Sequence, residues 1–296
     1  MTPNSLRQAI ENRIASLTGR NLGGVDYTEP KGDPGLFGPE TVAWKVHGEF
    51  TPMMCGGISA LLLQMLHPLA LAGVWDHSNF RKDMIGRLRR TSQFIAVTTF
   101  GARDDAERIL ERVRRVHDGV HGVTRDGRPY AANDPELLVW VHVAEMSRFL
   151  AAHRRYRNPH LSLADQDRYF AETARVAEAL GATNVPKSRA AIDAYLEDQR
   201  RYLVCDARTR DVIAVLLDAL PPNPVVRPVG KLFMRAGVDL LPTWAATLLS
   251  LEMSTPERHA VRSGVRTLAP VVRWAVRNGS YRRAMERMQA KEQAQT

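Results

Sequence analysis

Residues 135–155 read PELLVWVHVAEMSRFLAAHRR, and this stretch decides the fold class. A proline at the first position suits the first turn of a helix, and Asn133 or Asp134 can cap that turn. The segment is apolar nearly all round, with Leu137 and Trp140 among its residues. Such a helix is typical of the buried centre of a helical bundle.

Helical periodicity continues on both sides of this segment, with apolar residues at three- and four-residue steps. It predicts helices at residues 4–18, 53–66, 83–100, 102–118, 163–180, 188–203, 206–219, 228–250 and 256–276, with a short helix to about 75. Residues 122–134 carry turn-forming residues, and a polar tail follows Met288. No run of alternating residues indicates a sheet, and no change of composition divides the chain. We therefore predict an all-α protein, a single multi-helix bundle domain over residues 1–296.

Residues 20–50 interrupt the helical pattern with repeated glycine and proline. This long irregular N-terminal segment exceeds an ordinary connection between helices. It is expected to be either a functional loop or a segment that wraps the surface.

Composition gives the chain 296 residues and a formal net charge of +9. A basic protein is suited to an acidic partner, but scattered arginines on solvated helix faces explain the same excess. The sequence has no helix-turn-helix and no aromatic RNA-binding motif, so no nucleic-acid partner is expected.

The two cysteines, Cys55 and Cys205, show no metal-binding spacing and no disulfide framework, which fits a reducing compartment. The first residues contain no apolar signal segment. No window reaches ~18 uninterrupted apolar residues, so no transmembrane helix is predicted. The sequence thus favours a cytoplasmic location.

His117 and His121 are the first candidates for chemistry. They are four residues apart at the end of the helix 102–118 and can share a face with Arg114. Neutral imidazole is a common metal ligand, so His117 is a candidate metal ligand. The same spacing also fits an ordinary surface pair, because no glutamate of an HExxH motif lies between them.

His142 lies within the most apolar helix of the chain. A buried imidazole needs partners for its ring nitrogens, because an unpaired one costs roughly 1–3 kcal/mol. His142 is therefore either a hydrogen-bonded core residue or a residue that points into a ligand cavity.

The helix 83–100 carries Arg87, Arg90 and Thr91 along one side. Guanidinium groups bind carboxylates through two parallel hydrogen bonds, so this stripe suits an anionic, partly apolar ligand. An exposed stripe paired with Asp104 or Glu107 fits equally well. The chain has no serine–histidine–acid triad, P-loop or GxGxxG motif.

Several motifs, taken in order, resemble one family. They are GISALLLQMLHP (57–68), Asp76-His77-Ser78, RLRRT (87–91), Phe100-Gly101, Val116-His117, DGRPYA (126–131) and LVWVH (138–142). The chain resembles the DUF2236 family, also described as the MpaB and rubber-oxygenase catalytic domain, which includes the latex-clearing proteins. The resemblance is strongest over residues 36–145.

This resemblance implies an all-helical fold and, from the latex-clearing branch, a b-type haem that cleaves a double bond of polyisoprene with dioxygen. The proximal haem ligand falls on His117 and the arginine before it on Arg114. The distal arginine–threonine pair falls on Arg87 and Thr91, and a further family histidine falls on His142. These residue types fit, because haem iron takes an axial imidazole and arginines pair with propionates.

Two positions depart from the latex-clearing pattern. Its distal lysine is replaced by Arg90, which is a poor iron ligand because its guanidinium stays protonated. The arginine four residues after the proximal ligand is replaced by His121, which removes a propionate partner or adds a candidate ligand. The missing export signal argues against solid rubber as the substrate. We therefore expect a haem b-dependent oxygenase or oxidoreductase that uses dioxygen on a small apolar or isoprenoid-like substrate; the alternative is a non-catalytic helical protein that binds a lipid-like or anionic ligand without haem.

Overall fold

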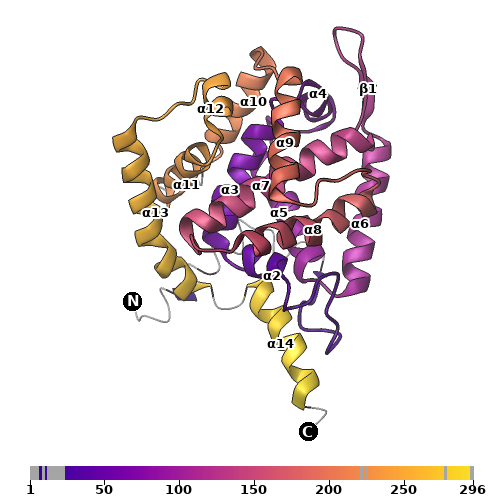
Figure 1. The fold of residues 1–296 in the computed structure, drawn as a ribbon, viewed down its shortest axis with the longest axis vertical. Helices are drawn as coiled ribbons and strands as arrows, with labels where there is room; N and C mark the ends of the chain where they lie inside the picture. Colours follow the sequence, from indigo (N-terminus) through magenta and orange to yellow (C-terminus); the bar gives the residue numbers. More distant parts are fainter. Residues whose placement is uncertain are drawn as a thin grey trace.

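The computed structural model describes residues 7, 8, 11, 24–220, 223, 226–276 and 279–293, and these are almost entirely helical (Figure 1). The helices are α2 (Val42–His47), α3 (Phe50–Gln64), α4 (Pro68–His77), α5 (Met84–Phe100), α6 (Arg103–Asp118), α7 (Pro135–Tyr156), α8 (Leu163–Leu180), α9 (Arg189–Gln199), α10 (Ala207–Leu217), α11 (Arg227–Asp239), α12 (Thr243–Leu248), α13 (Thr255–Ala275) and α14 (Ser280–Gln293). The predicted all-α class is confirmed. The helix predicted at 4–18 lies largely outside the described residues.

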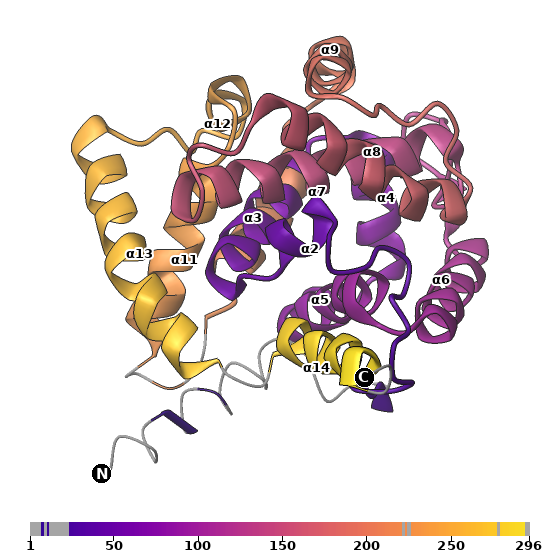
Figure 2. The ribbon, with the colours of Figure 1, turned by 60° about the horizontal axis from the view of Figure 1, so that its bottom comes forward.

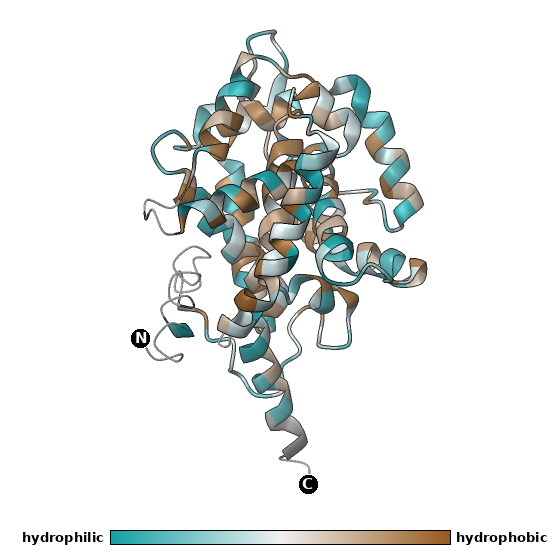
Figure 3. Cartoon of the chain, turned by 90° about the vertical axis from the view of Figure 1, so that its left-hand side faces the viewer, coloured by the Kyte–Doolittle hydropathy of each residue, from teal (hydrophilic) through white to brown (hydrophobic). Residues whose placement is uncertain are grey.

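Helix α7 is the centre of the bundle, as its apolar sequence predicts. Asp134 caps it by accepting hydrogen bonds from the backbone N–H groups of Glu136 and Leu137. Helix α7 packs along α3, and the Trp140 indole nitrogen donates to the carbonyl oxygen of Gln64 at 3.3 Å. Trp140 is fully buried within the main hydrophobic core. Along the outer helices, hydrophilic and hydrophobic residues alternate, as expected where one face is buried (Figure 3).

Three local predictions differ from the structure. The turn-rich segment contains a short antiparallel hairpin, β1 (His121–Val123) and β2 (Pro129–Ala131), which projects from the bundle (Figure 1). The single helix expected at 228–250 is divided into α11 and α12 around Pro242, which has no N–H to donate and does not fit inside a helix. No helix was predicted in the polar tail after Met288, whereas its described residues, up to Gln293, belong to helix α14.

The described part of the irregular N-terminal segment is held against the bundle by α14. Arg287 of α14 is fully buried. Its guanidinium donates to the carbonyl oxygens of Asp33 at 2.8 Å, Tyr27 at 3.1 Å and Gly101 at 3.4 Å. Helix α14 also lies beside α5 (Figure 2). Of the two expectations for this segment, the described residues fit surface packing, and part of it forms α2.

A buried carboxylate joins the central helix to the C-terminal half. The side chain of Asp239 at the end of α11 is fully buried. It pairs with Arg155 of α7 at 2.7 Å and with Arg262 of α13 at 2.9 Å. Because each partner comes from a different helix, this cluster fixes how α7, α11 and α13 lie together.

No single helix in the described parts of the chain has both the length and the apolar character to cross a membrane. Helices α3 and α4 together meet the length and composition criteria, but the pair is bent by 102°.

Candidate functional site

The predicted site residues lie on α5, α6 and α7 and on the hairpin after α6. Helix α5 has its close backbone neighbours in α2, α6 and α14, whereas α7 packs against α3 and α8. The charge of Arg87 on α5 acts on the carboxyl group of Glu145 on α7.

His117 lies in the last turn of α6 and is half-buried. Its Nδ1 atom is buried and has no hydrogen-bond partner, whereas Nε2, which also makes no hydrogen bond, is not among the buried atoms. Burial lowers the pKa of His117, and the neighbouring Asn133 side chain and the charge of Asp118 oppose this. The ring is therefore neutral near pH 7 and has an accessible nitrogen.

His142 on α7 is buried, with 6% of its surface exposed. Its Nε2 atom is buried without a partner, and burial lowers its pKa to about 4. His47 shows the opposite case, because its Nδ1 lies 2.9 Å from the Thr99 hydroxyl and its Nε2 lies 2.8 Å from the Tyr169 hydroxyl. His47 is thus a satisfied core histidine, and His117 and His142 are not.

Arg87 of α5 contacts the loop that follows α4. Its Nη1 atom donates to the Ser78 hydroxyl at 3.1 Å, and Thr91 donates to the Arg87 carbonyl oxygen at 3.2 Å. Burial lowers the pKa of Arg87, as does the nearby charge of Arg90, while Glu145 raises it. The structure thus brings Arg87 and Thr91 together on the inner side of α5.

Glu145 is a candidate site residue that the sequence analysis missed. It lies one turn after His142 on α7 and keeps some accessible surface. Burial raises its pKa to about 7, although a hydrogen bond with Gln64 and the charge of Arg87 lower it. The signal in the sequence was a lone acid inside the most apolar helix, three residues after a histidine.

The other predicted site residues lie at the surface. The Arg90 side chain is 61% exposed and pairs with Asp83 at 3.4 Å. The Arg114 side chain is 56% exposed and approaches Glu111. Helix α6 ends at Asp118, so exposed His121 lies in β1 and does not form the helical pair expected with His117. In the described residues, no hydrogen bond or ion pair joins His117 to Arg87, Thr91 or His142.

The Asp76-His77-Ser78 motif connects the hairpin and α5 to the end of α4. Tyr130 of β2 donates its hydroxyl hydrogen to Asp76 at 2.6 Å. That hydroxyl has one hydrogen, so His77 Nε2, which lies 3.2 Å away, acts as a donor to it. Ser78 accepts from Arg87. The motif therefore holds together the segments that carry the candidate residues.

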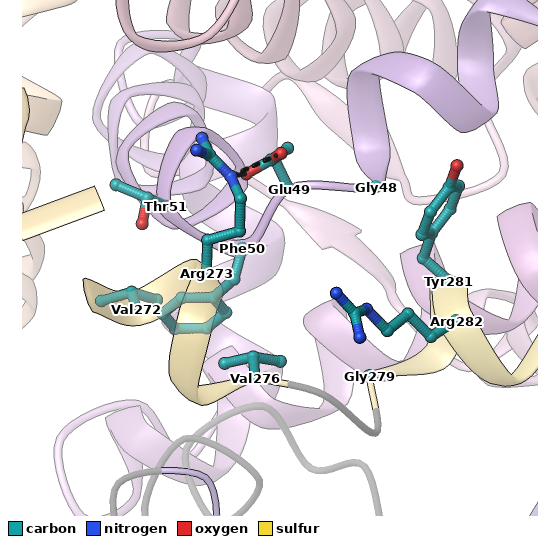
Figure 4. A pocket seen from close by; sticks show the side chains of 10 residues that line it. All are labelled: Gly48, Glu49, Phe50, Thr51, Val272, Arg273, Val276, Gly279, Tyr281 and Arg282. Atoms are coloured by element: carbon teal, nitrogen blue, oxygen red, sulfur yellow. Dashed lines mark hydrogen bonds and ion pairs between the residues drawn. The ribbon is translucent and has the colours of Figure 1, made fainter. Parts of the chain in front are cut away.

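Two surface hollows lie away from these residues. One of about 150 Å³ lies between the α2–α3 connection and the α13–α14 region, and there Arg273 pairs with Glu49 (Figure 4). The other, of about 620 Å³, is lined by His67, Leu137, Tyr195 and residues around them. Its charges are largely paired already, since Arg201 contacts Asp198 at 2.7 Å and Arg128 contacts Asp126 at 2.7 Å.

Comparison with protein families decides which group the chain belongs to. The family described as "ER-bound oxygenase mpaB/B'/Rubber oxygenase, catalytic domain" matches residues 44–274, which include α5, α6 and α7. The chain belongs to this family. The resemblance found in the sequence is thereby confirmed. Searches of the curated proteins and of the solved structures found no match.

The donor atoms of this oxygenase-family chain can be compared with what a haem requires. In the described residues, no group of three or more His, Cys, Asp or Glu side chains is placed to hold a metal. Haem iron is held by the porphyrin and needs only one or two axial side chains. An imidazole with an accessible, unpaired nitrogen, as at His117, meets that need.

Proposed function

We propose that this chain is a haem b-dependent oxygenase that acts with dioxygen on a small apolar or isoprenoid-like substrate. The observation that carries the proposal is the unpaired imidazole of His117 in a chain that belongs to an oxygenase family. His117 Nε2 would hold the haem iron. When bound, the haem would supply the binding and activation of dioxygen.

Arg87 and Thr91 would contact the substrate or dioxygen. Arg87 uses one N–H group on Ser78 and keeps further donors for an oxygen atom of the substrate or of dioxygen. The Thr91 hydroxyl donates to the backbone, so its oxygen remains an acceptor. The two residues would thus orient a polar group beside an apolar substrate.

Glu145 would hold the exchangeable proton of the site. Its pKa of about 7 lets it gain or lose a proton near neutral pH, and the Arg87 charge keeps that value from rising further. His142, one turn away on α7, would support the haem from the buried side. The partly buried Leu88, Ile95 and Val141 belong to the core surface and would exclude water from an apolar substrate.

The exposed cationic side chains would bind the haem propionates at the protein surface. Arg114, Arg90 and His121 keep much of their surface accessible, which suits contact with the carboxylates of haem propionates rather than with the iron. The surface pairs that Arg90 and Arg114 form with Asp83 and Glu111 are weak and exchangeable.

The test is oxygen incorporation. The full chain reconstituted with haemin is incubated with squalene, an isoprenoid with isolated double bonds, under ¹⁸O₂. Cleavage of one carbon–carbon double bond by one dioxygen molecule gives two carbonyl groups, each labelled. We expect labelled aldehyde or ketone products that are lost in His117→Ala and retained in His259→Ala, an exposed histidine on α13. Haemin binding without labelled products from any apolar substrate would contradict the oxygenase proposal, and no haemin binding at all would favour a non-catalytic ligand-binding protein.

A further inference from the structure

His117 and Asn133 each have one buried polar atom without a partner. In His117 this atom is Nδ1, and in Asn133 it is the amide oxygen Oδ1. Buried polar groups are hydrogen-bonded in the great majority of cases, so each such atom requires an explanation. An N–H group on the ring and an amide oxygen are complementary as donor and acceptor.

The amide of Asn133 is fixed in one orientation by its nitrogen. Nδ2 donates to the Asp118 carboxylate and lies 3.4 Å from the carbonyl oxygen of Arg114. Both neighbours are acceptors, so a flipped amide would place its oxygen against two other oxygens. Oδ1 must therefore face away from them, and it remains available to a donor.

The hairpin places this oxygen beside the last turn of α6. The Val120 N–H donates to the His117 carbonyl oxygen at 2.9 Å, and the Ala132 N–H donates to the Val120 carbonyl oxygen at 2.8 Å. These two hydrogen bonds place Ala132, the residue before Asn133, beside the segment that follows His117. The Asn133 side chain contacts residues on both sides of His117 in the sequence, the carbonyl oxygen of Arg114 and the carboxylate of Asp118.

We propose that Asn133 accepts a hydrogen bond from Nδ1–H of His117 and so holds the imidazole in the tautomer whose Nε2 is unprotonated. Nε2 then points away from Asn133 with its lone pair free for an iron. Metal-ligating histidines commonly donate their second ring N–H to an oxygen, which fixes the ring and makes it a stronger ligand. Asn133 is thus a positioning residue. Its role towards iron rests on the proposed function, whereas the tautomer is a property of the chain alone.

The tautomer can be measured without haem. The full chain is labelled with ¹⁵N-histidine and studied by long-range ¹H–¹⁵N correlation at a pH well above the ordinary imidazole pKa of 6.5. His117→Gln assigns the signals. We expect the proton of His117 on Nδ1, the form that is less favoured in free histidine. Asn133→Leu should shift the proton to Nε2, and Asn79→Leu, at an exposed asparagine between α4 and α5, should leave it unchanged.

A second measurement addresses the ligand role. Haemin affinity of the full chain should fall by about 10- to 100-fold in Asn133→Leu and remain unchanged in Asn79→Leu. In the ferrous protein, the iron–histidine stretching band should move to lower frequency in Asn133→Leu, because the ring loses its hydrogen-bond acceptor.

The outcomes separate this inference from the proposed function. A wild-type protein with the His117 proton on Nε2, or one whose tautomer is the same in Asn133→Leu, would overturn the role of Asn133. If the Asn133→Leu variant does not fold, the tautomer of His117 in the wild type still tests the role of Asn133. A wild-type protein that shows the Nδ1–H tautomer but binds no haemin would support the contact with Asn133 and contradict the haem proposal.

Discussion

The Nη1 atom of Arg87 donates a hydrogen bond to the Ser78 hydroxyl at 3.1 Å, and the same guanidinium influences the carboxyl group of Glu145 on the central helix. One side chain thus contacts the loop after α4 and also acts electrostatically on α7.

Removal of the Arg87 charge should raise the pKa of Glu145 above its value of about 7. The positive charge of Arg87 favours the ionised carboxylate and so lowers the pKa. Without this charge, the effect of burial, which raises the pKa, is opposed less strongly. A carboxyl-carbon NMR titration of Arg87→Leu measures this directly. Arg90→Leu removes an equal charge from the exposed side of the same helix and should leave Glu145 unchanged. Equal pKa values in the wild type and Arg87→Leu would contradict the assigned contact.

The protonation of Glu145 should make stability depend on pH. The folded chain holds this proton up to about pH 7, whereas the unfolded chain releases it near 4.5. From this group alone, the free energy of unfolding therefore falls as pH rises between these values. Glu145→Gln lacks the titration, so the stability of the wild type relative to the variant should decline over this window. Urea unfolding at a series of pH values measures it, and parallel pH profiles would rule out a raised pKa.

Asp239→Asn should strongly destabilise the fold. The variant leaves Arg155 and Arg262 facing a neutral, fully buried amide, and breaking a buried pair costs about 3–5 kcal/mol. Asp198→Asn is a suitable control because its pair with Arg201 is exposed and is worth less than about 1 kcal/mol. Chemical unfolding of both variants tests this, and similar losses would mean that Asp239 does not organise the C-terminal helices.

Gly35→Ala should loosen the N-terminal segment. Gly35 has φ +67°, and an added Cβ would collide with the carbonyl oxygen of Gly101 at the end of α5. Gly127→Ala in the hairpin shares the positive φ, at +83°, but meets open space. Backbone strain alone, of about 1–2 kcal/mol, applies to both. The excess loss of unfolding free energy in Gly35→Ala therefore measures the packing of this segment, and no excess would show that the contact is dispensable.

The helices could be predicted from the sequence because their apolar residues recur with helical spacing. Helix α7 is the clearest case, since its burial follows from its apolar sides. Helix α14 could not be predicted as a structural element, because its main contribution is the buried guanidinium of Arg287, whose partners Tyr27, Asp33 and Gly101 lie far away in sequence. The hairpin was missed because its three-residue strands are too short to show alternation.

The candidate site was predictable in residue type but not in arrangement. His117, Arg87 and Thr91 were identified by spacing and by family resemblance. Glu145 was missed because its raised pKa results from burial between helices, and the groups that oppose the rise, Gln64 and Arg87, come from two other helices. Asn133 was interpreted as a possible helix cap, yet Asp134 provides the cap and the Asn133 amide faces α6. Such relationships depend on tertiary contacts that a single sequence does not display.

The central claim, that His117 is the axial ligand of a haem, is tested most directly by the Soret band. The full chain is titrated with haemin, and wild type, His117→Ala and His259→Ala are compared under the same conditions. The account predicts a sharp, saturable Soret band at one haem per chain in the wild type and in His259→Ala, and its loss or marked shift in His117→Ala. An identical Soret band in all three proteins, or no band in any, would contradict it.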